Sequence, residues 1–189
     1  MIGMTGGIRH VKQVLAVIDM QVDFVNGSLG TKEAEGIVQN VVKKIQNWDG
    51  PVYATRDTHE ENYLETQEGT HLPVVHCVRN TPGWEIVPEV AAALKEKHAV
   101  IIDKPTFGSL TLAEQLKMLN QKEPVSIELI GLCTDICVVS NALLLKANMP
   151  EVPISVDASC CAGVTPASHQ AAIDTMRSCQ IEVLNGNPD

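Results

Sequence analysis

Six short apolar segments alternate with longer stretches of helical spacing, and this alternation limits the fold of the chain more than any other feature. QVLAVID, at residues 13–19, is a near-continuous apolar run, which is typical of a strand buried on both faces. Further strands are expected at residues 51–56, 99–103, 125–131, 152–158 and 181–184, and helices at residues 32–48, 110–120, 135–147 and 166–179. Strands that alternate with helices form βαβ units, so the sequence predicts an α/β fold with a parallel sheet covered on both faces.

Length and composition favour a single domain over residues 1–189, with a loose leader at residues 1–10. The formal net charge of −9 argues against nucleic-acid and anionic-membrane partners, because both need clustered lysine and arginine. No run approaches the ~20 apolar residues of a membrane span. The 6 cysteines lack the density of a secreted disulfide framework, and no signal segment is seen, so free thiols and a cytoplasmic location are expected.

Chemically active side chains follow three of the predicted strands. Asp19 ends the first, Lys104 follows the third, and Cys137 lies in GLCTDICVV, residues 131–139, after the fourth. The carboxyl ends of parallel strands share one edge of a sheet, so we expect these residues to converge. A helix start and a nearby ammonium group lower the pKa of a thiol, which makes Cys137 a candidate nucleophile with Asp19 as its proton acceptor. The alternative is that Cys137 is a small buried core residue.

A polar segment at residues 57–84 is long for a connection inside a compact domain, and such loops are usually functional or mobile. Asp57 and His59 are two apart, so in an extended chain their side chains point the same way, and His76 follows later. Two imidazoles and a carboxylate leave open positions on a Zn²⁺, Mn²⁺ or Fe²⁺ ion. The alternative is a surface loop rich in histidine and glutamate. Further candidate ligands are Glu65, Glu68 and His71.

Four motifs, in this order along the chain, resemble those of one family. IDMQVDF, TRDTH with its later HC pair, DKPTFG and GLCTDICV are similar to motifs of the isochorismatase-like cysteine hydrolases, and within them of the nicotinamidase/pyrazinamidase branch. The resemblance runs from about residue 14 to the C-terminus. It implies a three-layer αβα fold with a six-stranded, mostly parallel sheet, in agreement with the elements predicted above.

The resemblance also implies roles for single residues. The catalytic aspartate falls on Asp19, the lysine on Lys104 and the nucleophile on Cys137. The Leu132–Cys133 peptide is expected to be cis, and the backbone amides of Cys133 and Cys137 are expected to form an oxyanion hole. Phe24 matches an aromatic residue of the substrate pocket wall. The implied ligands of a divalent metal ion are Asp57, His59 and His76.

The sequence departs from this branch near the metal motif. Nicotinamidases commonly carry a tryptophan in the stretch before the HC pair, where it helps to sandwich a pyridine ring. Here that stretch is HLPVVHC, with Leu72 and no tryptophan, and Trp84 lies further on. Tyr63 and Leu64 also differ from the expected pattern. The hydrolase machinery is therefore better supported by the sequence than the substrate is.

Three functions follow from these observations. The first is a metal-assisted cysteine amidohydrolase that acts on a small carboxamide, with nicotinamide as the leading candidate, through a thioester. The second uses the same residues to hydrolyse a ureido or carbamoyl compound, or an isochorismate-like vinyl ether. The third is a non-catalytic binding module, which the intact Asp19, Lys104 and Cys137 disfavour. The resemblance further suggests a homodimer or homotetramer.

The other cysteines and histidines are expected to be structural. Cys160 and Cys161 are predicted to follow the fifth strand as packing or loop residues, and Cys77 is predicted to face the core. Cys179 is predicted to end a helix. We interpret His169 as structural or interfacial rather than as a ligand. His10 and His98 are predicted to be exposed.

Overall fold

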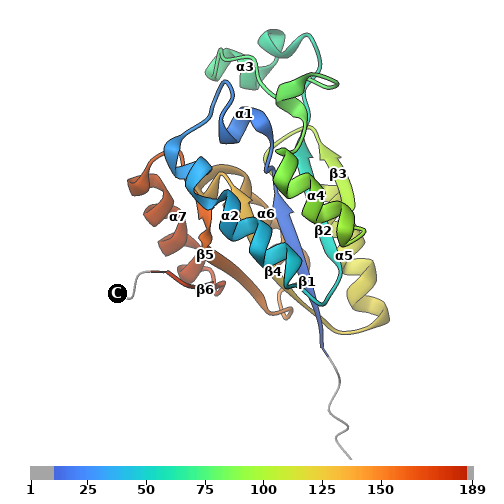
Figure 1. Ribbon diagram of the computed structural model, residues 1–189. Helices are drawn as coiled ribbons and strands as arrows, with labels where there is room; N and C mark the ends of the chain where they lie inside the picture. The colour runs from blue at the N-terminus through green and yellow to red at the C-terminus, as the bar shows by residue number, and fades with distance from the viewer. Residues whose placement is uncertain (1–10, 187–189) are drawn as a thin grey trace, which may run out of the picture.

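The computed structural model describes residues 11–186, and these form a six-stranded sheet between two layers of helices (Figure 1). All neighbouring strands are parallel, in the order β3-β2-β1-β4-β5-β6. The strands are β1 Lys12–Ile18, β2 Val52–Asp57, β3 Val100–Lys104, β4 Val125–Leu132, β5 Ile154–Ala162 and β6 Glu182–Leu184. The predicted αβα architecture is confirmed. The predicted leader and His10 lie outside the described residues.

Alternate side chains of the central strands supply two separate cores. Val14, Ala16 and Ile18 of β1 pack toward one face, and Leu15 and Val17 pack toward the other, as the twofold period of a strand requires. The first face is covered by α5 (Leu110–Lys122), α6 (Val139–Asn148) and α7 (Pro166–Ser178), and the second by α2 (Lys32–Gln46) and α4 (Pro88–Glu96). Because both faces are buried, the inner strands read as continuous apolar runs.

Two local predictions were wrong, and one helix was missed. Helix α4 was not predicted, because PEVAAALKE is short and buries only Val90, Ala93 and Leu94. Strand β5 runs to Ala162, so the vicinal cysteines lie within it and not after it. The helix predicted from residue 135 begins instead as a π-helical turn, η3 (Thr134–Val138), which leads directly into α6.

The connection between β2 and α4 is an ordered cover over the carboxyl ends of the strands, seen with α3 at the top of Figure 1. It contains η1 (Tyr63–Glu65), α3 (Gln67–His71) and η2 (Pro82–Trp84), and the short helix α1 (Val22–Val25) lies near η2. The buried Tyr63 donates its hydroxyl hydrogen to the carbonyl of Leu72 at 2.8 Å. Asp23 of α1 accepts a hydrogen bond from the backbone N–H of Cys77 at 2.7 Å. These contacts hold residues 57–84 in place, a segment for which the sequence alone allowed either a functional or a mobile loop.

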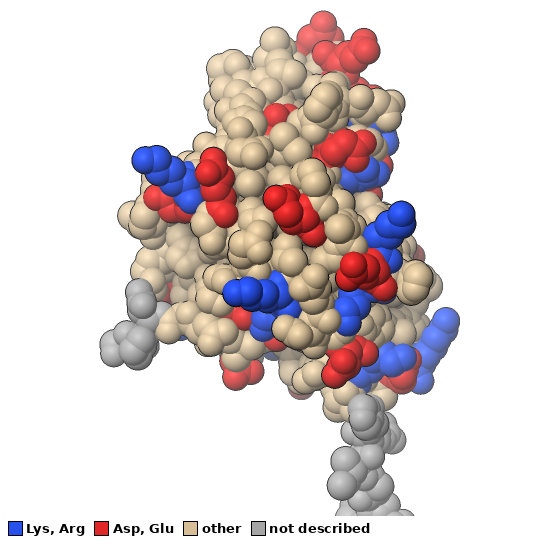
Figure 2. Space-filling view, viewed as in Figure 1, with Lys and Arg blue, Asp and Glu red and all other residues tan. Residues whose placement is uncertain are grey.

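On the face shown in Figure 2, acidic and basic side chains are interspersed over the helices. None of the helices in the described part of the chain is long and apolar enough to cross a membrane.

Candidate active site

The ends of β1, β2 and β3 bring three charged side chains together, those of Asp19, Asp57 and Lys104. The buried Lys104 places its Nζ 2.7 Å from Asp19 Oδ2 and 3.2 Å from Asp57 Oδ1. Nζ also donates a hydrogen bond to the carbonyl of Thr106 at 3.0 Å and lies 3.6 Å from Cys137 Sγ. Thr55 on β2 donates to Asp19 Oδ1 at 2.7 Å. One ammonium group therefore contacts both carboxylates and the thiol.

Cys137 lies in the π-helical turn η3, directly after β4. The Leu132–Cys133 peptide before this turn is cis. The carbonyl of Cys133 accepts hydrogen bonds from the N–H groups of Ile136 and Val138, at 3.1 and 3.0 Å, on either side of Cys137. This short loop holds the sulfur at the carboxyl edge of the sheet, beside Lys104.

Gly131 makes the close approach of β4 and β1 sterically feasible. Its φ of +117° disfavours any residue with a side chain, and a Cβ atom there would lie 2.1 Å from the carbonyl oxygen of Ile18. We expect Gly131→Ala to lower the free energy of unfolding by about 3 kcal/mol or more, measured by denaturant titration. Gly36→Ala is the matched control, because nothing lies within 4 Å of its added methyl group on α2. That variant should be neutral or more stable, by up to about 1 kcal/mol. Equal stability of the two variants would contradict the steric argument.

Burial controls the ionisation of the nucleophile candidate. It raises the pKa of the Cys137 thiol well above its ordinary value; the Asp19 carboxylate adds to the rise, and Lys104 opposes it. The prediction that the helix start and Lys104 together lower the thiol pKa was therefore wrong in its net direction. Burial also raises the pKa of Asp19 despite the nearby ammonium group. Burial would lower the pKa of Lys104, but the Asp19 carboxylate and other neighbours outweigh it and raise that pKa. These directions favour the neutral thiol over the thiolate in the resting site.

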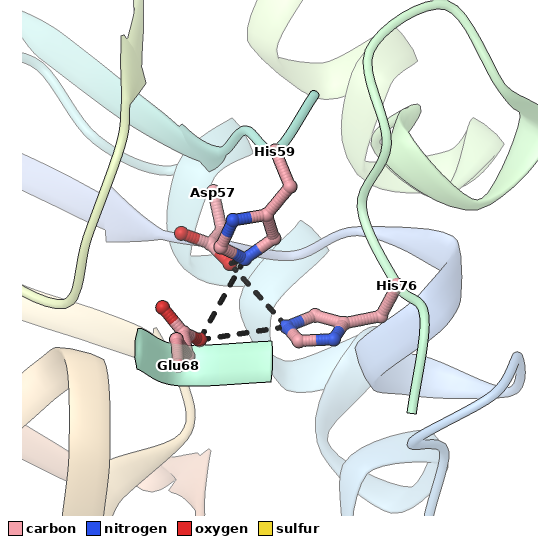
Figure 3. Close-up of side chains that lie close together, drawn as sticks. All are labelled: Asp57, His59, Glu68 and His76. Carbon is pink, nitrogen blue, oxygen red and sulfur yellow. Dashed lines mark ion pairs between the residues drawn. The ribbon is translucent and has the colours of Figure 1, made fainter. Parts of the chain in front are cut away.

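Asp57 also belongs to a second cluster, which it forms with His59, Glu68 and His76 (Figure 3). Asp57 Oδ2 is 2.9 Å from His59 Nε2 and 3.6 Å from His76 Nε2. Glu68 Oε1, carried by α3, is 3.6 Å from His59 Nε2 and 3.8 Å from His76 Nε2. One ligand atom from each residue lies within 4.8 Å of the others, so the four form a candidate metal-binding group.

The donor set suits a divalent cation. His76 Nδ1 is 2.8 Å from the carbonyl of Val74, so it carries the proton of the neutral ring and leaves the Nε2 lone pair facing the cluster. His59 Nε2 is buried and has no hydrogen-bond partner of good geometry among the described residues. Burial raises the pKa of Glu68, and repulsion by Asp57 adds to this. A cation would give His59 Nε2 a partner of good geometry and would offset the charge of the two carboxylates. Two further candidates do not join the cluster: Glu65 is exposed, and so is His71, whose Nδ1 is 2.8 Å from the carbonyl of Gln67.

A cavity of about 200 Å³ lies between the thiol and the candidate metal group. Cys137 and Cys133 line one side, and Asp57, Glu68 and His76 line the other. The rest of the wall is apolar and consists of Phe24, Leu29, Leu72, Phe107, Ile136 and Val164. Trp84 is not part of this wall: its ring lies 3.6 Å from the guanidinium of Arg56, and its Nε1 donates to Thr58 Oγ1 at 2.8 Å. It does not replace the tryptophan missing before the HC pair.

Comparison with known proteins identifies the family. The model of the isochorismatase domain matches residues 13–187. The chain belongs to this family. The nicotinamidase of Saccharomyces cerevisiae is 26% identical over 176 residues, which cover 69% of this chain and 80% of that protein. The nicotinamidase/pyrazinamidase of Mycobacterium tuberculosis is 24% identical over 187 residues, with 91% and 98% covered. The crystal structure of a Pyrococcus horikoshii pyrazinamidase in complex with zinc has a TM-score of 0.76 and 28% identity, with 93% and 99% covered.

Membership of the isochorismatase family confirms the resemblance seen in the four motifs. It also confirms the predicted enzyme class, an amidohydrolase that acts on C–N bonds. The roles of single residues stay predictions, although the structure brings the residues together. All six cysteines are free, Cys77 is buried, and Cys179 follows α7, while His98 is exposed. His169 Nδ1 lies 2.8 Å from Thr134 Oγ1, a contact that ties α7 to η3.

Sequence reasoning missed two buried side chains that hydrogen-bond to the residues of the site. The fully buried Gln21 accepts a hydrogen bond from the Asp57 N–H at 2.7 Å and donates to the Asp57 carbonyl at 2.8 Å. Thr55 orients Asp19, as described above. Both could have been suspected as polar residues next to or within apolar strands, since a buried polar group needs a partner.

Proposed function

We propose that this protein is a metal-assisted cysteine amidohydrolase that cleaves a small neutral carboxamide, with nicotinamide as the leading candidate. The observation that carries the proposal is the position of Lys104 Nζ, 2.7 Å from Asp19 and 3.6 Å from the Cys137 sulfur, next to a cavity that also contacts the candidate metal group. The relatives named nicotinamidase and pyrazinamidase support the choice of substrate class.

The proposed reaction uses the three residues in two half-reactions. Asp19 takes the proton of the Cys137 thiol, and the thiolate attacks the amide carbonyl carbon. The backbone amides of Cys133 and Cys137 donate hydrogen bonds to the oxyanion. Protonated Asp19 returns the proton to the leaving nitrogen, so ammonia departs and a thioester remains. Asp19 then deprotonates a water molecule that attacks the thioester, and the carboxylic acid leaves as the thiol is restored. Lys104 stays charged throughout and stabilises whichever neighbour is anionic.

The candidate metal group would position the ring of the substrate. The four residues of this group, Asp57, His59, Glu68 and His76, would hold a zinc, manganese or iron ion. Such an ion, when bound, would act as a Lewis acid toward a ring nitrogen of the substrate, directly or through a water molecule on the ion. The zinc complex of the Pyrococcus horikoshii relative supports this assignment. Phe24, beside the His76 ring at a centroid distance of 5.5 Å, would contact one face of the substrate ring.

The lining of the cavity favours a neutral substrate over an isochorismate-like vinyl ether. Of the described residues that line it, Asp57 and Glu68 are acidic and none is lysine or arginine. An isochorismate-like vinyl ether carries carboxylates, and the described lining offers no arginine or lysine to bind them. Neutral ureido or carbamoyl compounds stay an alternative that an amide panel can test. The predicted homodimer or homotetramer also stays a prediction, to be measured by light scattering.

Ammonia release from a panel of amides tests the proposal. We expect purified protein to release ammonia from nicotinamide and pyrazinamide, to lose this activity after chelator treatment, and to recover it on addition of zinc, manganese or iron. Metal analysis before and after chelation gives a readout that does not depend on turnover. If fully metallated protein released ammonia from ureido compounds but from neither ring amide, the alternative substrate would replace nicotinamide.

The pH dependence of the reaction follows from the burial of Asp19. Its carboxylate must be free to accept the thiol proton, and burial raises its pKa above the ordinary value of 3.8. The proton acceptor is therefore lost as the pH falls through this raised value, and kcat/KM should decline on the acid side at a pH above 3.8. Initial rates in buffers of constant ionic strength measure this decline. If the acid side of the pH–rate profile gave the ordinary pKa of an aspartate, the assignment of Asp19 as proton acceptor would be contradicted.

A further inference from the structure

Asn141 is a buried amide that joins two walls of the proposed active site. It lies on α6, one helical turn after Cys137, with a relative exposure of 1%. Its Nδ2 donates to the carbonyl of Cys137 at 2.8 Å and to the carbonyl of Phe107 at 3.0 Å. Its Oδ1 accepts a hydrogen bond from the N–H of Ser109 at 2.9 Å. Both hydrogens and the oxygen of the side chain are thus used, and two of these three bonds leave the helix.

The loop that Asn141 contacts, residues 105–109, carries two parts of the site. The carbonyl of Thr106 accepts a hydrogen bond from Lys104 Nζ at 3.0 Å. Phe107 lines the cavity although 43% of it is exposed. Ser109 then begins α5, with its Oγ accepting from the N–H of Leu112 at 3.1 Å. Asn141 thus joins two segments by hydrogen bonds: the turn that carries Cys137, and the loop whose Thr106 carbonyl accepts a hydrogen bond from the Lys104 ammonium group.

Only a side-chain amide can make this set of contacts. An amide offers two donors and an acceptor in one plane, whereas a carboxylate offers no donor. A threonine at this position can bond back to the carbonyl four residues earlier, as hydroxyl groups in helices do, but it is too short to reach the loop as well. An alanine leaves the Phe107 carbonyl and the buried Ser109 N–H without these partners.

We propose that Asn141 is a positioning residue that sets the separation of the Cys137 sulfur from the Lys104 ammonium group, now 3.6 Å, and keeps Phe107 in the cavity wall. The proposal rests on the proposed cysteine hydrolase function and adds a residue to it that touches neither substrate nor sulfur. It predicts that the bonds to the loop matter for catalysis and that the bond along the helix does not.

The variants Asn141→Thr and Asn141→Ala test this proposal. Asn141→Thr keeps the helix bond and loses the loop bonds. We expect it to lower kcat by about tenfold or more and to change KM by less than about threefold, since a small misplacement of reacting groups is costly. The rate at which iodoacetamide labels Cys137, followed by peptide mass spectrometry, should fall by about fivefold or more, because the thiolate loses its ammonium partner.

Asn148→Thr is the matched control. Asn148 lies on the same helix and donates to the carbonyl of Leu144, also four residues earlier, at 2.9 Å, but it is exposed. This variant should keep wild-type kcat, KM and labelling rate. Ile45→Val, in the core on the opposite face of the sheet, controls for a general loss of stability.

The labelling experiment separates this inference from the proposed function, because it needs no substrate. Wild-type protein that turned over no amide would refute the proposed function, while the labelling rates would still decide the role of Asn141. Wild-type kcat and labelling in a folded Asn141→Thr variant would overturn the inference. So would an equal loss of both in Ile45→Val. If Asn141→Ala were not recovered folded, Asn141→Thr alone would decide.

Discussion

Cys137→Ala should lower ammonia release from nicotinamide by about 10⁴-fold or more, whereas Cys133→Ala should retain most of the activity. Both thiols line the same cavity, but only the sulfur of Cys137 lies within 3.6 Å of Lys104 Nζ. Cys133 is expected to contribute its backbone amide, which alanine preserves. Single-turnover assays on the two variants, at matched metal content, measure the difference.

Trapping of the intermediate adds a direct test of the same prediction. Wild-type protein quenched in acid during turnover should carry the mass of an acyl group on the peptide that contains Cys137, and Cys133→Ala should carry it too. Cys137→Ser should keep the fold and lose most of the rate, because a hydroxyl is a weaker nucleophile at this pH. An acyl group on Cys133, or an active Cys137→Ala, would show that the nucleophile is assigned to the wrong residue.

Lys104→Met should be the most destabilising single change in the site, lowering the free energy of unfolding by about 3–5 kcal/mol. The side chain of Lys104 is fully buried and lies between the buried carboxylates of Asp19 and Asp57. Methionine fills the space but leaves both carboxylates without their cation. Denaturant unfolding gives the stability, and the same samples should show no measurable amidase activity.

Lys44→Met provides the matched control for Lys104. Lys44 also bridges two carboxylates, Glu128 at 2.6 Å and Asp157 at 2.7 Å, but its side chain is 24% exposed and none of the three lines the cavity. We expect a smaller loss of stability and an unchanged kcat. A variant of Lys104 that was as stable and as active as Lys44→Met would contradict the central role given to its ammonium group.

The convergence of Asp19, Lys104 and Cys137 could be predicted because it depends on a regularity of the fold. Parallel strands all end at one edge, so residues at their carboxyl ends meet there whatever the details of packing. Glu68 was only one of three further ligand candidates, because its position depends on how α3 lies over the sheet. That in turn depends on the packing of Tyr63 against the two histidine rings, with centroids 4.6 and 5.0 Å away. No periodicity in the segment encodes that contact.

The ionisation of Cys137 illustrates a different limit. The motif indicated a thiol at the start of a helix, next to an ammonium group, and both features favour a thiolate. The depth at which the thiol lies is a property of the whole fold, and desolvation at that depth, with the nearby Asp19 carboxylate, outweighs the effect of the ammonium group. The support given by Gln21 and Asn141 was missed for a similar reason, since each joins segments that are distant in sequence.

The burial of Lys104 between Asp19 and Cys137 has a consequence for the electrostatics of turnover. In the resting state the three groups sum to zero charge: one ammonium, one carboxylate and one neutral thiol. In the proposed reaction the proton moves to Asp19, and the sum is again zero, with the negative charge now on sulfur. The proposed first step would therefore relocate one charge within the low-dielectric interior and would neither bring a charge in from water nor expel one. The solvation energy that makes a lone buried thiolate unfavourable is largely absent from this exchange. A high thiol pKa in the resting site is thus compatible with fast chemistry. The proton passes between Cys137 and Asp19, so the difference between their two pKa values matters, and the pKa of the thiol relative to water does not.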